Sequence, residues 1–320
     1  MRNYLLWRMA LFLPTLLLAS VVIFLIMRVL PGDVAQVVLG GSGEVTQDLQ
    51  QIERVREQLG LNDPLIMQYG GWMRSLAGPD LGGASLDTRE TLRSLLARQA
   101  PVTILLAVYT MALAILFAIP LGVLAARTHN RWPDQLIRLL TFSGQALPSF
   151  FVALLALLVL VLAFHWSPPI RYAAPWRNPW DHLQIMAVPV AVRAWGYGAY
   201  LARITRAAVL EVIEEDYIRM ARGKGLPQRA VTLKHALRNA LIPVVTVAGL
   251  QTGAMLSGIV VLEALFGLPG LGRGIVQAVA SRDYPVVQTL TLVAVGFMLC
   301  LNLLIDATYA AIDPRVRYRV

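Results

Sequence analysis

Long apolar runs, separated by shorter charged segments, set the pattern of this 320-residue chain. Five of them contain no charged side chain, and each reaches the roughly 18–20 residues that cross a bilayer: 9–27, 101–126, 139–164, 239–262 and 284–305. A sixth run, 183–201, is interrupted only by Arg193. The pattern therefore predicts an all-α integral membrane protein with six transmembrane helices.

The polar segment 31–98, between the first two apolar runs, has a pattern of its own. Apolar residues recur at helical spacing in 46–59, and Pro64 opens a second helical stretch that extends to Leu76. A turn-rich connector at 78–83 precedes a third short helix, 89–99. The segment is predicted to be a helical lobe, which either packs on the membrane part or docks a soluble partner.

Positive charge predicts the orientation. Sixteen of the 28 Lys and Arg residues lie in four short segments, 1–8, 127–138, 203–238 and 313–320. The segment 31–98 instead holds six Arg against nine acidic residues. By the positive-inside rule, both termini are expected in the cytoplasm and the lobe outside. The predicted domains are an N-terminal transmembrane helix (1–30), the external lobe (31–98), a five-span core (99–312) and a cytoplasmic tail (313–320).

Composition narrows the function classes. The chain is 57% hydrophobic and 15% charged, with a net charge of +9, but its basic residues sit between apolar blocks, so no nucleic-acid surface is expected. One cysteine, Cys300, and four scattered histidines offer no metal-ligand spacing. No phosphate-binding loop with a Gly-Lys-Ser/Thr ending occurs. We therefore expect no catalytic residue, no metal and no cofactor bound by this chain.

The most informative segment is the basic loop 203–240. Its charged residues cannot lie in the hydrocarbon, so it must lie at a membrane face. An Ala221-x-x-x-Gly225 spacing suits a short surface helix whose small residues allow close approach of a partner, and Gly225 permits a sharp turn before Pro227. The candidate coupling residues are Asp216, Arg219, Ala221, Arg222, Gly223, Lys224 and Gly225.

This loop, with His235-Ala236-Leu237-Arg238-Asn239-Ala240 after it, resembles the coupling loop of ABC importer permeases of the dipeptide/oligopeptide/nickel transport family. Position 219 is Arg where the generic importer motif has Glu, which suits the peptide branch. A second stretch, 263–288, resembles the family's Gly-rich external hairpin, which dips toward the translocation path. Its candidate residues are Glu263, Phe266, Pro269, Gly270, Gly272, Asp283 and Tyr284.

The resemblance implies a type I importer permease fold in a bacterial inner membrane, forming half of a translocation pathway for short peptides or related small solutes. It also implies a homologous second permease, with a heterodimer favoured over a homodimer. Two ABC ATPases that carry the ATP and Mg, together with an external binding protein, complete the implied assembly. The exact substrate, whether dipeptide, oligopeptide, glutathione-like peptide or nickel complex, is left open.

Arg193 is the one cation inside a predicted span. An Arg at that depth costs on the order of 2.5 kcal/mol or more unless it faces water or a partner. We expect it to be an unpaired cation in a translocation cavity, near Trp195 and Tyr197, where it contacts anionic cargo; the alternative is a structural pair or a side chain that reaches the interface. A stand-alone secondary transporter or channel, and an integral-membrane enzyme, are the rival functions.

Overall fold

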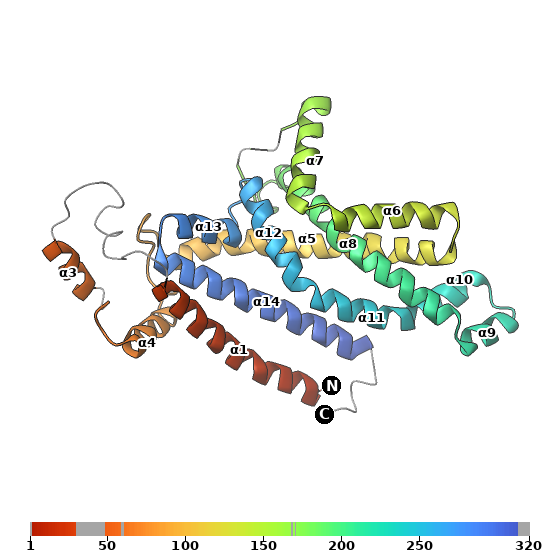
Figure 1. Cartoon of the computed structure of the whole chain (residues 1–320), viewed down its shortest axis with the longest axis horizontal. Helices are drawn as coiled ribbons and strands as arrows, with labels where there is room; N and C mark the ends of the chain where they lie inside the picture. Colours follow the sequence, from red (N-terminus) through yellow and green to blue (C-terminus); the bar gives the residue numbers. More distant parts are fainter. Residues whose placement is uncertain (1, 30–48, 59–60, 168, 170, 313–320) are drawn as a thin grey trace. The chain divides into compact units, whose positions relative to one another are not determined.

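The computed structural model describes residues 2–29, 49–58, 61–167, 169 and 171–312 (Figure 1). Within these residues the regular structure is helical, apart from an isolated bridge between Ala84 and Thr91. The helices are α1 (Arg2–Val29), α3 (Leu49–Gln58), α4 (Leu65–Leu76), α5 (Leu92–Arg127), α6 (Trp132–Ala146), α7 (Ser149–Phe164), α8 (Pro179–Ile213), α9 (Asp216–Gly223), α10 (Gln228–Ala230), the π-helix η1 (Val231–Ala236), α11 (Leu237–Leu250), α12 (Thr252–Leu265), α13 (Leu271–Ala280) and α14 (Tyr284–Ile312).

Three helical segments are long and apolar enough to cross a membrane, namely Trp7–Val29, Leu92–Arg127 and Tyr284–Ile305. The number rises to five if each of two bent helix pairs counts as one span. Helix α8, where we predicted a sixth span, is 35 residues long but does not meet the same test. The all-helical class is confirmed, and the count of six spans stays a prediction.

Three predicted elements differ in the structure. The run 139–164 is not one straight span, because α6 and α7 meet at Pro148 with a bend of 107° (Figure 1). The expected short helix 89–99 is instead the start of the continuous helix α5. The predicted Gly-rich hairpin, 263–288, was expected to be irregular but contains helix α13. Its non-helical residues are confined to short turns on either side of that helix. The predicted break at 31–33 lies outside the described residues.

The chain divides into two compact units. One comprises residues 9–103 and 269–299, and the other comprises 1–8, 104–268 and 300–320. In the first unit, α4 begins after Pro64 as predicted and packs on α1 through aromatic rings. Phe24 lies 5.5 Å from Tyr69 and 6.2 Å from Trp72 between ring centroids, and the hydroxyl groups of Ser20 and Tyr69 are hydrogen-bonded at 2.8 Å.

The apolar core of the first unit joins four helices. Its buried side chains come from α1, α5, α13 and α14 and include Met27, Leu92, Leu95, Leu96, Leu271, Ala278, Val286, Val287 and Leu290. Helices α5 and α13 approach closely at Gly274, where an added Cβ would lie 2.2 Å from the Gln99 amide oxygen. The Thr103 hydroxyl accepts a hydrogen bond from the Leu271 N–H at the start of α13. A larger residue at position 274 would therefore require the buried Gln99 side chain to move or the two helices to separate.

In the second unit, α8 contacts α6, α7, α11 and α12. Buried Asp134 of α6 accepts two hydrogen bonds from Arg206 of α8, at 2.7 and 2.8 Å. The same carboxylate accepts the Asn130 N–H at 3.0 Å. A bidentate pair of this kind, with a buried carboxylate and a largely buried guanidinium, fixes the register of the two helices.

Candidate functional site

The basic loop contains a short helix, α9, whose buried side packs on η1 and on the end of α8. Ile218 and Ala221 of α9 form a buried cluster with Val231 and Ala236 of η1, and Val212 and Ile213 at the end of α8 pack against it. The Asn239 amide donates a 2.7 Å hydrogen bond to the Tyr217 hydroxyl, which joins α9 to α11. Helix α9 is thus fixed to the ends of two long helices (Figure 1).

Ala221 has a different role from the one predicted. We expected its small side chain to let a partner approach, but it is buried in the chain's own cluster. Its size matters because it lets α9 lie close to η1. Gly223 is exposed, and an added Cβ there would meet no heavy atom within 4 Å, so it remains a candidate for close approach of a partner.

Gly225 ends α9 in the way its position predicts. Its φ is +77°, a conformation that L side chains rarely adopt. The Gly225 N–H donates to the Arg222 carbonyl at 2.9 Å, and the Leu226 N–H donates to the Ala221 carbonyl at 3.4 Å. These two bonds make a Schellman motif, in which a left-handed glycine lets the chain reverse and satisfies carbonyls at the helix end.

The outer surface of this loop is both apolar and basic. Met220, Leu226 and Leu233 are exposed apolar side chains, and Tyr217 is at the margin of exposure. Arg219, Arg222 and Lys224 are exposed beside them, and an exposed ion pair joins Arg219 to Asp216 at 3.6 Å. A short helix with exposed apolar anchors and a cationic rim is suited to insertion in a groove of a partner protein with acidic edges.

The guanidinium of Arg193 is bonded to backbone carbonyls, although it has no acidic partner among the residues that the structure describes. Its Nε–H donates to the Met255 carbonyl at 3.1 Å and its Nη2–H to the Ala254 carbonyl at 2.5 Å, both in the first turn of α12. An added Cβ at Gly258 would lie 2.7 Å from the guanidinium carbon, so the glycine lets Arg193 lie flat against α12. The guanidinium therefore links α8 to α12 through neutral carbonyls.

Tyr197 forms a second link on the same side of α8. Its buried hydroxyl donates to the Ala248 carbonyl of α11 at 2.9 Å. Helices α11 and α12 are bent by 49° at Gln251. Tyr197 bonds a carbonyl before this bend, which also accepts the Thr252 hydroxyl at 3.0 Å, and Arg193 bonds two carbonyls after it.

A cavity lies beside Arg193, and its role in translocation stays a prediction. A hollow of about 300 Å³ between α6, α7, α8 and α12 is lined by Arg193, Trp195 and Tyr197 together with Gln145 and Tyr200. The indole of Trp195 donates to the Leu140 carbonyl of α6 at 3.2 Å. The three residues predicted to share a cavity do so, although each is already held by a backbone carbonyl.

The residues of the predicted hairpin are mostly buried. Glu263 and Phe266, at the end of α12, lie in the second compact unit. The others belong to the first unit, where Gly270 precedes α13, Gly272 lies in its first turn, and Pro269 is half-buried. Asp283 and Tyr284 open α14 and are buried. Their role as a lining of a translocation path stays a prediction.

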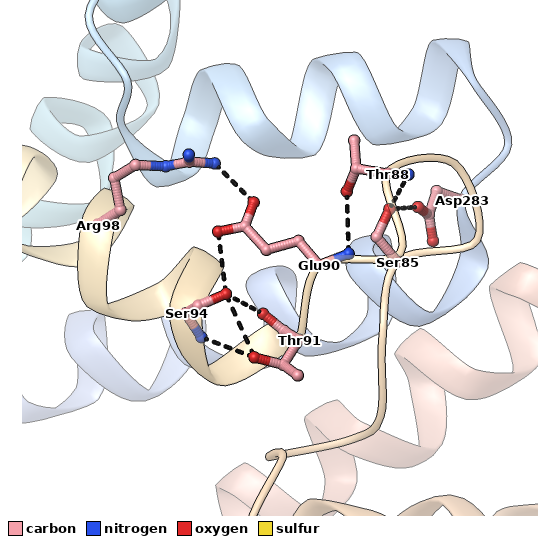
Figure 2. Close-up of polar contacts among 7 residues, drawn as sticks. All are labelled: Ser85, Thr88, Glu90, Thr91, Ser94, Arg98 and Asp283. Carbon is pink, nitrogen blue, oxygen red and sulfur yellow. Dashed lines mark hydrogen bonds and ion pairs between the residues drawn. The ribbon is translucent and has the colours of Figure 1, made fainter.

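Asp283 organises a network that the sequence did not indicate (Figure 2). Its carboxylate accepts the Ser85 hydroxyl at 2.5 Å and the Leu86 N–H at 2.9 Å, while its second oxygen accepts the Val286 N–H at 3.4 Å. Asp283 therefore caps α14 and holds the loop at 85–87 at the same time. Nearby, Glu90 accepts bonds from Ser94 and Arg98.

Replacing Asp283 by alanine is expected to lower the melting temperature of the purified protein in detergent. Loss of a helix cap costs about 0.5–2 kcal/mol, and each buried donor left unsatisfied adds about 1–3 kcal/mol. The matched control is Asp80→Ala, because Asp80 is an exposed carboxylate in the same compact unit. Equal melting temperatures for both variants would show that the Asp283 network does not stabilise the fold.

Comparison with known proteins places the chain in a family. Residues 118–318 match the model of the binding-protein-dependent transport system inner membrane component, and residues 1–107 match the N-terminal model of the same system. Two relatives named glutathione transport system permease protein GsiC, from Escherichia coli O6:H1 strain CFT073 and Shigella boydii serotype 4, are each 38% identical over 320 residues, the full length of both chains. A crystal structure of an amino acid ABC transporter with histidines aligns with 70% of this chain and 94% of its own, at a TM-score of 0.49 and 16% identity.

The chain belongs to the family of binding-protein-dependent inner membrane transport components, the permease subunits of ABC importers. It is a multi-pass membrane subunit of the transporter rather than its ATPase. The family predicted from the basic loop is thereby confirmed.

Proposed function

We propose that this chain forms half of the translocation pathway of an ABC importer for short peptides, and that the loop around α9 transmits force from an ATPase. The observation that carries the proposal is the construction of α9. It is anchored to α8 and η1 by buried apolar residues and to α11 by the bond between Tyr217 and Asn239, while apolar and basic side chains remain exposed. Movement of α9 would therefore be passed to two long helices.

The assembly would contain a second, homologous permease, in a heterodimer, with two ABC ATPases that bind ATP and Mg and an external binding protein that delivers the substrate. Both relatives carry names that refer to glutathione. We extend this to a short peptide of similar size as the substrate here. Alternating access would follow when closure of the ATPases moves α9 and opens the pathway on the outer side.

The topology would comprise six spans with both termini in the cytoplasm. Helix α8 would be the sixth span, because its 35 residues, at about 1.5 Å per residue, exceed the thickness of the hydrocarbon core. Its charged residues would lie near its ends or, as with Arg193, against the interior of the protein. The domain limits would be 1–30, 31–98, 99–312 and 313–320.

Cysteine labelling tests this orientation. With Cys300 first replaced by serine, Gln50→Cys is expected to react with an impermeant maleimide added to intact cells, because the lobe would face outward. Lys224→Cys is expected to react only after the membrane is opened, because the loop would face inward. Both positions are exposed, so access to reagent depends on the side of the membrane. Reaction of Lys224→Cys in intact cells would overturn the topology.

Copurification tests the proposed assembly. A tagged form of the chain is expected to retain its ATPase subunits in stoichiometric amount when extracted in mild detergent. Adding the loaded binding protein should stimulate ATP hydrolysis by that complex. A chain that purifies alone and moves peptide under an ion gradient would instead support a stand-alone secondary transporter.

A further inference from the structure

A second and larger cavity lies between α6 and α8. Its volume is about 830 Å³, within the range of about 300–1,000 Å³ typical of ligand pockets. Arg138 of α6 and Arg203 and Arg206 of α8 line it, with Gln145 at one edge. Gln145 also lines the hollow beside Arg193, so the two cavities are neighbours along the same pair of helices.

Helix periodicity explains why these residues share one side. On α8, Arg193, Gly196, Tyr200 and Arg203 follow one another at intervals of three and four, which places them on one face. On α6, Arg138, Thr141 and Gln145 do the same. Arg193 and Arg203 are ten residues apart, about 15 Å along the helix axis at 1.5 Å per residue.

The charged side chains that line the two cavities are all basic. None of the described residues that line either cavity is acidic. The charge of Arg206 is offset by buried Asp134, but Arg138 and Arg203 are exposed, and the guanidinium of Arg203 stacks over the Tyr200 ring at 5.3 Å. Arg193 uses two of its five N–H groups on neutral carbonyls, which leave its charge uncompensated.

We propose that these two cavities form one anion-binding track, and that the cargo it accepts is a short peptide carrying excess carboxylate. Arg193 would meet a carboxylate at one end, and Arg138 with Arg203 would meet one at the other. Guanidinium groups suit this role because they remain charged and bind carboxylates through two parallel hydrogen bonds. The proposal rests on the proposed function, since it requires that the α6–α8 side faces the translocation pathway.

The test compares uptake of three probes by proteoliposomes that contain the complete transporter and its binding protein: glutathione, which is anionic, trialanine, which is neutral, and trilysine, which is cationic. The double variant Arg138→Gln/Arg203→Gln is expected to take up glutathione at least about tenfold more slowly than the wild type. The loss of a hydrogen bond to a charged group is large enough to cause a reduction of that size. Trialanine uptake should stay within about twofold. Arg193 is a poorer target, since its replacement also removes the link to α12.

Arg131→Gln is the matched control, because Arg131 is an exposed arginine at the start of α6 that lines neither cavity. It should leave all three uptake rates unchanged. Equal loss for all probes, or no loss of glutathione uptake, would overturn the anion track. A loss seen only in vesicles containing phosphatidylglycerol would assign the arginines to a lipid headgroup and also overturn it. Two measurements on the wild-type complex test the proposed function independently of the anion track: trialanine uptake and the stimulation of ATP hydrolysis by the binding protein. If both fail, the proposed function fails, whatever the variants show.

Discussion

Replacing Gly225 by phenylalanine is expected to abolish the stimulation of ATP hydrolysis by loaded binding protein, while the chain still inserts in the membrane. Gly225 has a φ of +77° and closes the Schellman motif at the end of α9. A side chain in the left-handed conformation costs about 1–2 kcal/mol. The strain is relieved most easily by loss of the last turn of α9, which would displace its exposed apolar and basic side chains. The measurement is the ATPase rate of the purified complex with and without binding protein.

A control variant separates the backbone conformation from the loss of a glycine. Gly225→Asn should retain most of the stimulation, because asparagine tolerates the left-handed region. If Gly225→Phe inserts normally and transports at the wild-type rate, α9 is not the coupling element.

Replacing Arg206 by methionine is expected to cause the largest loss of stability of any single change considered. It would leave Asp134, which has no exposed surface, as a buried carboxylate without its cation. Removing one partner of a buried pair costs about 3–5 kcal/mol. The measurement is thermal unfolding of the purified chain in detergent, with Arg203→Met as control, since Arg203 is exposed and one turn away.

A double variant refines this prediction. Asp134→Leu combined with Arg206→Met removes both charges and is expected to recover most of the lost stability, because apolar pairs often replace buried ion pairs at no cost. If Arg206→Met alone melts like the wild type, the pair does not hold α6 and α8 in register. If the double variant is no more stable than the single one, the loss comes from packing rather than from the stranded charge.

Local rules predicted the elements that depend on neighbouring residues. Pro64 fixed the start of α4, and apolar spacing identified α3, whose described part lies within the predicted range. Gly225 was identified as a turn residue because only a glycine easily takes a positive φ there. Family membership could also be predicted, because the loop combines basic residues with Ala and Gly at distinctive spacings.

Long-range contacts could not be predicted in the same way. Asp134 and Arg206 are 72 residues apart, and Ser85 and Asp283 are 198 apart, so no local pattern pairs them. The inward position of Ala221 was missed because a helix of eight residues has apolar side chains on both faces. The bend at Pro148 was missed because hydropathy counts apolar residues and does not register the direction of the chain.

ATP-dependent uptake by the reconstituted complex tests the central claim most directly. Proteoliposomes containing this chain, its partner permease and the ATPases should accumulate labelled glutathione only when ATP is on the ATPase side and binding protein is on the other. The Gly225→Phe complex should accumulate none. Accumulation by this chain alone under a proton or sodium gradient, without ATP, would contradict the account.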